Sequence, residues 1–510
     1  MFLLRLIYIL IFLFFISCNS SNLIEKPNVV LFMVDDLGWQ DTSVSFWNNE
    51  TKFNKLYNTP NMERLAEMGV KFTNAYATPV CSPSRISLMT GMNAAKHRVT
   101  NWTLHPNKKK PAEINHKTFE FPDWNYNGLS ISDSVSNSVY ATPLPQILND
   151  NGYYTIHAGK AHLGAIGYPS SDPLNIGFDI NIAGHAAGAP QSYLGTDNFG
   201  NNDQKNKIWA VPGLEKYHGK NIFLTQAITE EVLIKIQKPI KSKSPFFLYF
   251  SLYGVHAPLM EDNRFVEKYK NIGIENPEIK YASMIESMDY ALGIVLDELK
   301  KKDILKNTII VFMSDNGGLS AVARGGQKHQ HNYPLRSGKG SIYEGGIRVP
   351  MIVYSPFHKT NVKEIDQPVI IEDFFPSILE LTNSKKSSIV QEIDGQSFIP
   401  LLNNEEIENK PLFWHYPNWW GPNGPGIGSY SAVRQEEWKF IYFHDTQTIE
   451  LYNLETDISE NNNLISVNYL KSEHLANVLT NYLISVDAQM PFNKKSKSIV
   501  PWPNQLPLFN

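Results

Sequence analysis

Runs of consecutive apolar residues, each about the length of a strand, recur along the first two thirds of the chain. The first is Asn28–Val34 (N-V-V-L-F-M-V), and such a run predicts a strand that is buried on both faces. Similar runs at residues 153–157, 246–252 and 308–313 predict further strands. Helical segments occupy residues 223–237 and 280–302 between them. This alternation predicts an α/β fold whose large, mostly parallel sheet is sandwiched by helices.

Boundary residues predict two further helices. Thr59 is suited to cap a helix that has Pro60 in its first turn and ends at Gly69. A short helix is predicted to start at Cys81 and to end near Gly91. This start places the Cys81 side chain beside backbone N–H donors, which favour an anion.

The pattern changes in two segments. Residues 100–133 are polar and rich in Pro and Asn, which predicts loops over the edge of the sheet. The Pro- and Gly-rich residues 418–428 precede two strand-like runs, 431–443 and 448–454, which predict a hairpin. We therefore expect a catalytic domain over residues 18–385 and a smaller C-terminal α+β subdomain, with an antiparallel sheet, over residues 386–510.

The N-terminus has the features of an export signal. After Arg5, an apolar run extends to Ile16 and ends at Ser17-Cys18, and this run is too short to span a bilayer. A small residue followed by Cys predicts a lipoprotein signal peptide over residues 1–17, with Cys18 lipidated. The protein is then exported and lipid-anchored, in the periplasm or at the cell surface. An ordinary secretion signal with a chance cysteine is the alternative.

Composition narrows the possible classes of protein. The formal net charge is -4, which gives no overall attraction to nucleic acid. The chain has only two cysteines, Cys18 and Cys81, so a disulfide framework is excluded. Because Cys18 is expected to be the lipidated N-terminal residue, Cys81 is the single cysteine inside the mature domain.

Oxygen-bearing side chains follow two of the predicted strands. Asp35 and Asp36 come after the first strand, and Asp315 and Asn316 follow residues 308–313. Ligands of open α/β sheets bind beyond the carboxyl ends of the strands. Four hard oxygen donors at one edge favour Ca²⁺ over Mg²⁺, which needs stricter geometry. Each acidic pair alone is also typical of a turn or a helix cap.

Cations and histidines mark further candidate positions. Arg85 offers planar donors for an oxyanion, although a Cys before Pro is also common as a small buried residue. Lys160 and His162 are two apart, so an extended chain presents them on one face for an anionic oxygen and a proton. His256 is a second acid/base candidate, and Lys339 lies in a Gly-flanked turn near the same edge. Structural or solvated roles are the alternatives for both.

Seven ordered motifs resemble the type I, formylglycine-dependent sulfatases of the alkaline-phosphatase superfamily, bacterial polysaccharide sulfatases in particular. The likeness covers nearly the whole mature chain. The motifs are N-V-V-L-F-M-V-D-D-L-G-W at 28–39, T-P-N-M-E-R-L-A-E-M-G-V-K-F at 59–72, C-S-P-S-R at 81–85, G-K-A-H-L-G at 159–164, H-A-P at 256–258, S-D-N-G-G at 314–318 and G-K-G-S-I-Y-E-G-G-I-R-V-P at 338–350.

The resemblance implies an alkaline-phosphatase-like fold and a role for each motif residue. Cys81 is expected to be oxidised to formylglycine by a maturation enzyme, and the hydrated aldehyde is the nucleophile. Ca²⁺ is expected to be bound by Asp35, Asp36, Asp315, Asn316 and the modified Cys81. Arg85 and Lys160 are expected to steady the formylglycine and the sulfate. His162 acts as base, and His256 with Lys339 serves the leaving-group oxygen.

The substrate is less well defined by the sequence. The aromatic residues 413–420, with His415 among them, and the loop around Trp102 and residues 108–110 suggest a sulfated sugar chain, although these aromatics fit a core equally well. Lys160, His256, Lys339, Arg336 and His415 are the predicted substrate-binding residues. Algal polysaccharides such as ulvan or carrageenan are expected, with host glycosaminoglycans behind them. The alternatives are a formylglycine-dependent phosphodiesterase or phosphonate hydrolase, and an inactive glycan-binding lipoprotein.

Overall fold

The computed structural model describes residues 26–203, 205–318, 331–358, 362–386, 388–421 and 424–509. The predicted leader and the lipidation of Cys18 lie outside these residues and stay predictions. Within the described part of the chain, no helix is both long enough and apolar enough to cross a bilayer.

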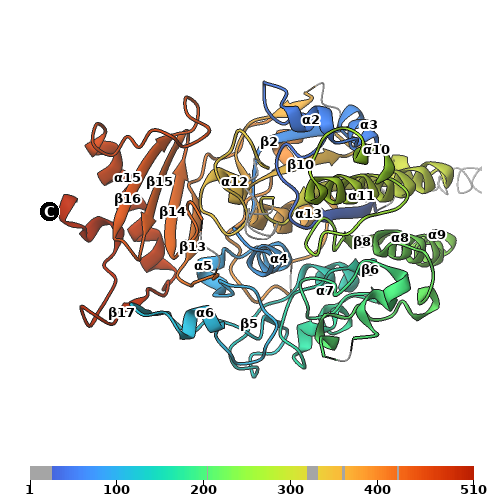
Figure 1. Ribbon diagram of the computed structural model, residues 1–510, viewed down its shortest axis with the longest axis horizontal. Coiled ribbons are helices and arrows are strands. Elements are labelled where there is room, and N and C mark those ends of the chain that lie inside the picture. Colours follow the sequence, from blue (N-terminus) through green and yellow to red (C-terminus); the bar gives the residue numbers. More distant parts are fainter. Residues whose placement is uncertain are drawn as a thin grey trace, which may run out of the picture.

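A nine-stranded sheet forms the centre of the larger part of the molecule (Figure 1). Seven strands run in the order β11-β2-β10-β9-β1-β8-β6, β7 follows β6 at the edge, and β12 pairs with β2. β1 lies parallel to both β8 and β9, whereas β10 is antiparallel to its neighbours β2 and β9. The strands are β1 (Asn28–Val34), β2 (Val70–Tyr76), β6 (Tyr154–Gly159), β7 (Ile180–Ile182), β8 (Phe246–Ser251), β9 (Thr308–Ser314), β10 (Arg348–Tyr354), β11 (Glu364–Ile365) and β12 (Val369–Ile370).

Helices cover both faces of this sheet, as the sequence pattern predicts. Alternate residues of β1 enter two different cores, because successive side chains of a strand point to opposite faces. One core includes Val30 and Phe32 with α3 (Pro60–Met68), α8 (Leu224–Lys235) and α11 (Asn276–Lys301). The other includes Leu31 and Met33 with α4 (Cys81–Thr90), α7 (Leu144–Asp150) and α13 (Phe374–Leu381). The predicted α/β sandwich is confirmed.

The C-terminal part builds a separate four-stranded antiparallel sheet. Its strands are β13 (Leu412–Tyr416), β14 (Tyr430–Gln435), β15 (Trp438–Phe443) and β16 (Thr448–Asn453). The predicted strand at 431–443 is in fact two strands, because the chain turns at Glu436 with φ 55°. β13 was not predicted as a strand. One face of this sheet joins the core around Tyr76, and the other packs on α15 (Tyr469–Ser485).

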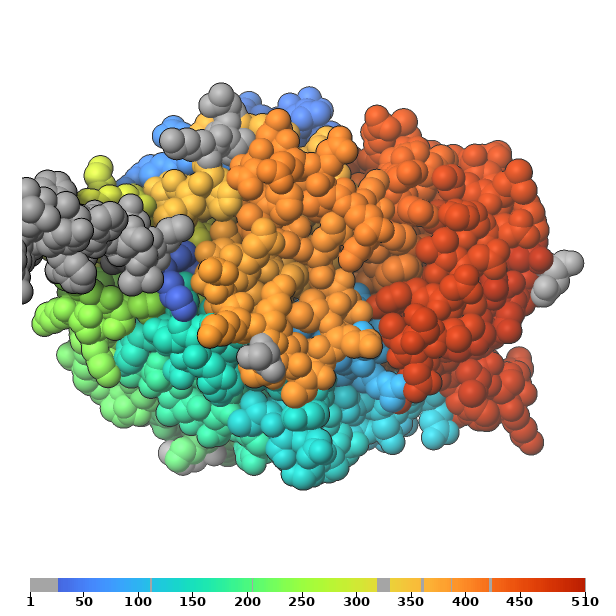
Figure 2. All heavy atoms as spheres, turned by 180° about the vertical axis from the view of Figure 1, so that it is seen from behind, coloured from blue at the N-terminus to red at the C-terminus, as the bar shows by residue number. Residues whose placement is uncertain are grey.

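Figure 2 shows the C-terminal residues as a block beside the larger part. The remaining elements are short, and the stretch 100–133 contains only three of them, in line with the predicted loops. They are α2 (Lys52–Leu56), α5 (Ala94–His97), α6 (Pro111–Ile114), α9 (Gln237–Ser242), α10 (Glu267–Lys270), α12 (Glu344–Ile347), α14 (Ile399–Leu402), β3 (Phe119–Glu120), β4 (Leu129–Ser130), β5 (Val139–Tyr140), β17 (Phe492–Asn493) and β18 (Ser498–Ile499).

The predicted helix boundaries hold, but one cap works differently. α3 starts at Pro60 after Thr59, yet the Thr59 hydroxyl makes no cap hydrogen bond and instead accepts one from the backbone N–H of Ser43 at 2.8 Å. α4 starts at Cys81 and ends before Gly91, whose φ of 70° suits a residue without a Cβ. The start of α4 therefore fixes Cys81 at the carboxyl edge of the sheet.

Candidate active site

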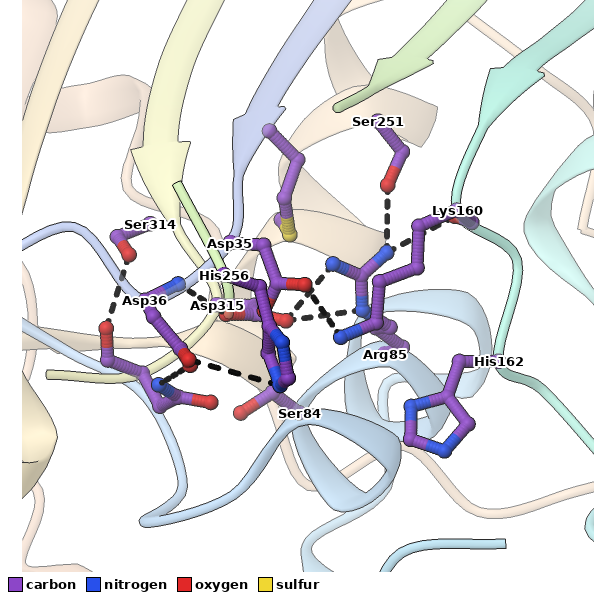
Figure 3. Close-up of polar contacts among 12 residues, drawn as sticks. Asp35, Asp36, Ser84, Arg85, Lys160, His162, Ser251, His256, Ser314 and Asp315 are labelled. Carbon is purple, nitrogen blue, oxygen red and sulfur yellow. Dashed lines mark hydrogen bonds and ion pairs between the residues drawn. The ribbon is translucent and has the colours of Figure 1, made fainter. Parts of the chain in front are cut away.

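Strand register brings the two oxygen-rich pairs together. β1 and β9 are parallel, with Val34 opposite Ser314, so the residues that follow each strand leave the sheet side by side. Asp35, Asp36, Asp315 and Asn316 are all fully buried there (Figure 3). These four residues lie together at one edge of the sheet, as predicted.

Three oxygen atoms of this set have no hydrogen-bond partner among the described residues. They are Oδ1 of Asp35, Oδ2 of Asp36 and Oδ1 of Asn316. Buried polar atoms are nearly always paired, because an unpaired one costs about 1–3 kcal/mol. Asp35, Asp36, Cys81 and His256 each place one ligand atom within 4.8 Å of the others. The residues present therefore fit a bound cation with oxygen ligands.

Three buried cations pair with the three carboxylates of the site. Lys160 Nζ lies 2.5 Å from Asp35 Oδ2, and Lys339 Nζ lies 2.7 Å from Asp36 Oδ1. Arg85 donates from Nε at 2.9 Å and from Nη2 at 2.7 Å to Asp315 Oδ2. The side-chain charges balance without a metal, so a divalent cation would give the site a net positive charge that suits an anionic substrate.

The two adjacent carboxylates of β1 have opposite pKa shifts. Burial, with Asp315 adding to it, raises the pKa of Asp35 well above its usual range although Lys160 opposes this. Burial also acts to raise the pKa of Asp36, but Lys339 and His256 outweigh it and hold that pKa below its usual range. Asp36 is therefore the more firmly ionised of the two, and Asp35 is the one whose charge most needs a further cation.

Arg85 is held by groups that the sequence did not reveal. Its Nη1 donates to Ser251 Oγ at 2.5 Å and to the backbone oxygen of Lys160 at 3.0 Å. Ser251 is the last residue of β8, next to β1, so a polar residue at the end of an apolar strand was the available signal. These bonds fix the guanidinium beneath the site and leave it little freedom to move.

Cys81 is the first residue of α4 and is 3% exposed. Burial raises the pKa of its thiol, although Lys160 and Lys339 lower it. A thiol with a raised pKa is protonated at neutral pH, and only the thiolate is a good nucleophile. The unmodified side chain is thus poorly suited to attack a substrate, despite its place among the buried cations.

The prediction that an extended chain presents Lys160 and His162 on one face is wrong. β6 ends at Gly159, and His162 has a φ of 53°, so the chain is no longer extended there. His162 Nε2 lies 3.0 Å from the backbone oxygen of Thr103, which can only accept, so Nε2 carries the proton. Nδ1 has no partner among the described residues, and burial with Lys160 lowers the pKa well below the usual value. His162 is thus a neutral imidazole with a free acceptor.

His256 faces the carboxylate of Asp36. Its Nδ1 donates to the backbone oxygen of Ala257 at 2.6 Å, which leaves Nε2 as an acceptor 3.6 Å from Asp36 Oδ2. Burial and Lys339 lower the pKa of His256 to about 3, although Asp36 opposes this. Two acceptors at this separation leave room for a proton or a cation between them. To act as an acid, His256 must gain a proton when an anion binds.

Two of the predicted substrate-binding residues are not brought into the site. Arg336 donates to the backbone oxygen of Glu460 at 2.9 Å and stacks 3.9 Å from the centre of the Tyr343 ring. His415 is 4% exposed in β13, with Nδ1 2.8 Å from Ser431 Oγ and Nε2 2.8 Å from the backbone oxygen of Gln489. Arg336 is held between Tyr343 and the C-terminal part, and His415 lies within the C-terminal part, which corrects the prediction.

Comparison with known proteins agrees with this geometry. Residues 27–384 match the Sulfatase family, and residues 337–489 match the family described as N-sulphoglucosamine sulphohydrolase, C-terminal. A protein named Sulfatase from Formosa agariphila is 29% identical over 540 residues, covering 96% of this chain and 94% of that protein. N-acetylgalactosamine-6-sulfatase of Mus musculus is 30% identical over 409 residues, covering 77% of this chain and 69% of that protein. The crystal structure of Ps i-CgsB in complex with k-i-k-neocarrahexaose is 28% identical, with a TM-score of 0.68 and coverage of 90% and 93%.

The fold and the site together define an alkaline-phosphatase-like α/β enzyme whose strand ends carry a cluster of oxygen ligands and cations. The chain belongs to the sulfatase family. It is accordingly a sulfuric ester hydrolase.

Proposed function

We propose that the protein hydrolyses sulfate esters of a sulfated oligosaccharide or polysaccharide, with a formylglycine made from Cys81 and a bound calcium ion. Asp35, Asp36, Asp315 and Asn316 would hold the calcium. The observation that carries this proposal is the group of three unpaired oxygen atoms beside Cys81, surrounded by three buried cations. Carboxylate and amide oxygens are the ligands that Ca²⁺ prefers.

The chain's own residues provide an electrostatic field for sulfate. When bound, the calcium and the hydrated aldehyde would supply a Lewis acid and a nucleophilic hydroxyl. Lys160 and Lys339 have ammonium groups beside the two Asp ligands, so either can turn a donor toward a sulfate oxygen without leaving the site. Arg85 is fixed on Asp315 and Ser251, and its charge strengthens the attraction for an anion in this water-poor setting.

The two histidines suit different proton transfers. His162 keeps an unprotonated Nδ1, and this atom can accept a proton from a hydroxyl at the Cys81 position. His256 has its Nε2 toward Asp36 and a fifth of its side chain exposed, so it can meet the leaving-group oxygen at the mouth of the site. Its pKa must rise for it to donate, and the negative charge of a bound sulfate ester acts in that direction.

A sulfated carbohydrate is the substrate class that the relatives favour. The solved structure of Ps i-CgsB contains k-i-k-neocarrahexaose, and the relative from Mus musculus is named N-acetylgalactosamine-6-sulfatase. We favour an algal polysaccharide such as carrageenan or ulvan, with host glycosaminoglycans as the next choice. None of the proposed catalytic positions has been lost, which argues against an inactive binding protein.

The partners and the location are proposed from the sequence. Oxidation of Cys81 requires a formylglycine-generating enzyme, and the Ser17-Cys18 pair favours a lipid anchor on an exported protein. Replacing Cys18 by Ala should release the protein from the membrane fraction. Unchanged membrane association would remove the support for lipidation.

Maturation and metal can be tested on one preparation. Protein made with a formylglycine-generating enzyme should carry the aldehyde in its Cys81 peptide by mass spectrometry, and protein made without it should carry the thiol. Only the first should hydrolyse a nitrophenyl sulfate. Exhaustive chelation should abolish that activity, and added calcium should restore it.

Two results would contradict the proposal. Full activity of a homogeneous thiol form would exclude the formylglycine, and full activity after complete metal removal would leave the acidic residues with a structural role. A phosphodiester control on the same preparation tests the runner-up activity. Faster turnover of the diester than of any sulfate ester would favour the phosphodiesterase reading.

A further inference from the structure

A short segment next to the catalytic site carries a partly exposed tryptophan. Thr103 contacts the site on two sides: its backbone oxygen accepts from His162, and its backbone N–H donates to Ser82 Oγ at 3.0 Å. Trp102, the preceding residue, packs against a small buried cluster of Leu104, Ala186 and Ala187. Gly188 then lies against the His162 ring, because a Cβ at that position would be 2.5 Å from Nδ1. Trp102 is thus linked to the His162 side of the site through two separate stretches of chain.

Lys110 covers one face of this tryptophan. Its Nζ lies 3.3 Å from the centre of the Trp102 ring and 5.8 Å from that of Trp124. The side chain is only 4% exposed. Among the described residues it has no ion pair and no hydrogen bond from Nζ, and the nearby carboxylate of Glu113 accepts instead from Asn101 at 3.1 Å and from the Lys110 backbone at 2.8 Å. Among the described residues this buried ammonium therefore has no carboxylate within ion-pair distance, although Glu113 is near enough to affect its pKa.

The two neighbouring lysines differ from Lys110, because neither is buried without an ion pair. Lys109 pairs with Asp123 at 3.0 Å, and Lys108 is exposed to solvent. Burial lowers the pKa of Lys110 to about 7, although Glu113 raises it. Buried charges are normally paired, because desolvation of a lone ammonium is costly. The cation–π contact with Trp102 offsets only part of that cost, so the arrangement suits an incoming anion.

We infer that Lys110 and Trp102 form a second anion-binding subsite, which takes a sulfate or carboxylate group of the sugar next to the one that is desulfated. This inference rests on the proposed carbohydrate sulfatase function. The ammonium supplies the charge, and the partly exposed indole supplies an apolar surface for the ring that carries the second anion. The enzyme should then prefer substrates with two acidic groups on adjacent sugars.

The test compares one charge change at two lysines of the same loop. Lys110→Met keeps the length and apolar contact of the side chain but removes its charge, and Lys108→Met is the matched exposed control. Each variant, matured and loaded with calcium, is assayed with three disaccharides: one with a single sulfate at the cleaved position, one with a second sulfate on the neighbouring ring, and one with a carboxylate there. Nitrophenyl sulfate is the fourth substrate.

We expect Lys110→Met to lower kcat/KM on a two-anion disaccharide at least tenfold more than on nitrophenyl sulfate, chiefly through KM. Lys108→Met should change no substrate more than twofold. Comparison of the loss of kcat/KM on the two two-anion disaccharides tells whether the subsite prefers a sulfate or a carboxylate. Equal losses on all substrates, or no loss on any, would overturn the subsite.

The outcome is separable from failure of the proposed function and from misfolding. If the wild-type enzyme cleaves nitrophenyl sulfate but none of the disaccharides, the proposal of a carbohydrate substrate is contradicted. Binding measurements would then test the subsite. In that case, affinity of the sulfated and unsulfated disaccharides for wild type and Lys110→Met is compared by calorimetry, and equal affinities overturn it. Lys110→Gln and a thermal melt of each variant exclude loss of fold.

Discussion

Two fully buried charge clusters can be compared within the described residues, the catalytic cluster and an interface cluster, and they differ in how completely their oxygens are paired. The interface cluster consists of Glu344, Lys439 and Glu460 with Tyr76, Arg348 and Arg434, between the large sheet and the C-terminal sheet. Lys439 Nζ lies 2.8 Å from Glu344 Oε1 and 2.8 Å from Glu460 Oε1, the latter as an ion pair. Tyr76 donates to Glu344 Oε2 at 2.6 Å, and the Glu344 N–H donates to Glu460 Oε2 at 2.6 Å.

In the interface cluster one carboxylate oxygen, Oε1 of Glu460, lacks a hydrogen-bond partner among the residues that the structure describes, but it lies 2.8 Å from Lys439 Nζ. In the catalytic cluster Oδ1 of Asp35, Oδ2 of Asp36 and Oδ1 of Asn316 all lack one within the described chain. Burial and charge are similar in the two places, so neither distinguishes a functional site from a structural one. The oxygens without any partner are what distinguish the two sites. We call the interface cluster the closed cluster, because each of its carboxylate oxygens contacts a donor or an ammonium group, and we call the catalytic cluster of Asp35, Asp36, Asp315 and Asn316 with its cations and histidines the open cluster. A closed cluster stabilises the fold, and an open cluster can bind a ligand.

The sharpest test of the open cluster is Asp36→Asn. It removes one charge and one unpaired oxygen, so we expect activity to fall about 10³-fold or more, since the proposed calcium would lose one of its ligands and Lys339 loses its partner. Calcium at 100 times its Kd should stabilise the wild type by about 2.7 kcal/mol, and this gain should be lost in the variant. Melting curves with and without calcium measure it.

Asp297→Asn is the matched control, because this exposed carboxylate forms a surface ion pair with Arg64 and lies outside both clusters. It should keep both activity and the response to calcium. A normal calcium response in Asp36→Asn would mean that the open cluster is not a metal site.

The closed cluster should respond in stability. Lys439→Met leaves Glu344 and Glu460 buried without their shared cation, and we expect a loss of about 3–5 kcal/mol in the free energy of unfolding, measured with urea. Lys495→Met, at an exposed position of the C-terminal part, should change it by less than about 0.5 kcal/mol. Equal effects of the two changes would show that the interface cluster adds nothing to the fold.

The two histidines of the open cluster should differ in their sensitivity to the leaving group. If His256 protonates the departing oxygen, His256→Ala should lose about 10²-fold more on a sugar sulfate than on a nitrophenyl sulfate. His162→Ala should be nearly independent of the leaving group and should give an initial burst of alcohol, because its step comes after the alcohol has left. Rates on esters of graded leaving-group pKa measure this, and equal sensitivity in both variants would reverse our assignment.

The smallest expected effect is a pH dependence of the closed cluster. Burial raises the pKa of Glu460 from 4.5 to about 7, with Lys439 opposing and Glu344 adding to the rise. A raised folded pKa gives stability that is complete below the unfolded value and is lost as pH rises through about 7. Urea midpoints of wild type should therefore fall between pH 5 and 8 more steeply than those of Glu460→Gln. Parallel curves would contradict the raised pKa.

The sequence predicted the open cluster well because local rules determine its position. A buried parallel strand followed by Asp35-Asp36 and another followed by Asp315-Asn316 must meet at one edge, and the start of α4 fixes Cys81 nearby. These inferences need only strand period and sheet topology. The α/β sandwich followed from the same pattern.

The errors came from contacts between residues far apart in the chain. His415 is hydrogen-bonded to Ser431 and Gln489. Arg336 is hydrogen-bonded to Tyr452 and Glu460. No local sequence pattern predicts such distant partners. β13 was read as a possible sugar-binding surface, but Trp414 is 2% exposed because the strand packs on the large domain. The interface cluster was missed for the same reason.

The place of Glu460 and Lys439 has a consequence for biosynthesis. Lys339 and Glu344 lie five residues apart, and Glu344 is held by side chains that leave the ribosome about a hundred residues later. The segment that carries Lys339 and Glu344 therefore completes its contacts only after residues 439 and 460 have been made. Because the finished fold buries Cys81, the proposed oxidation of this residue would have to take place before these C-terminal contacts are complete.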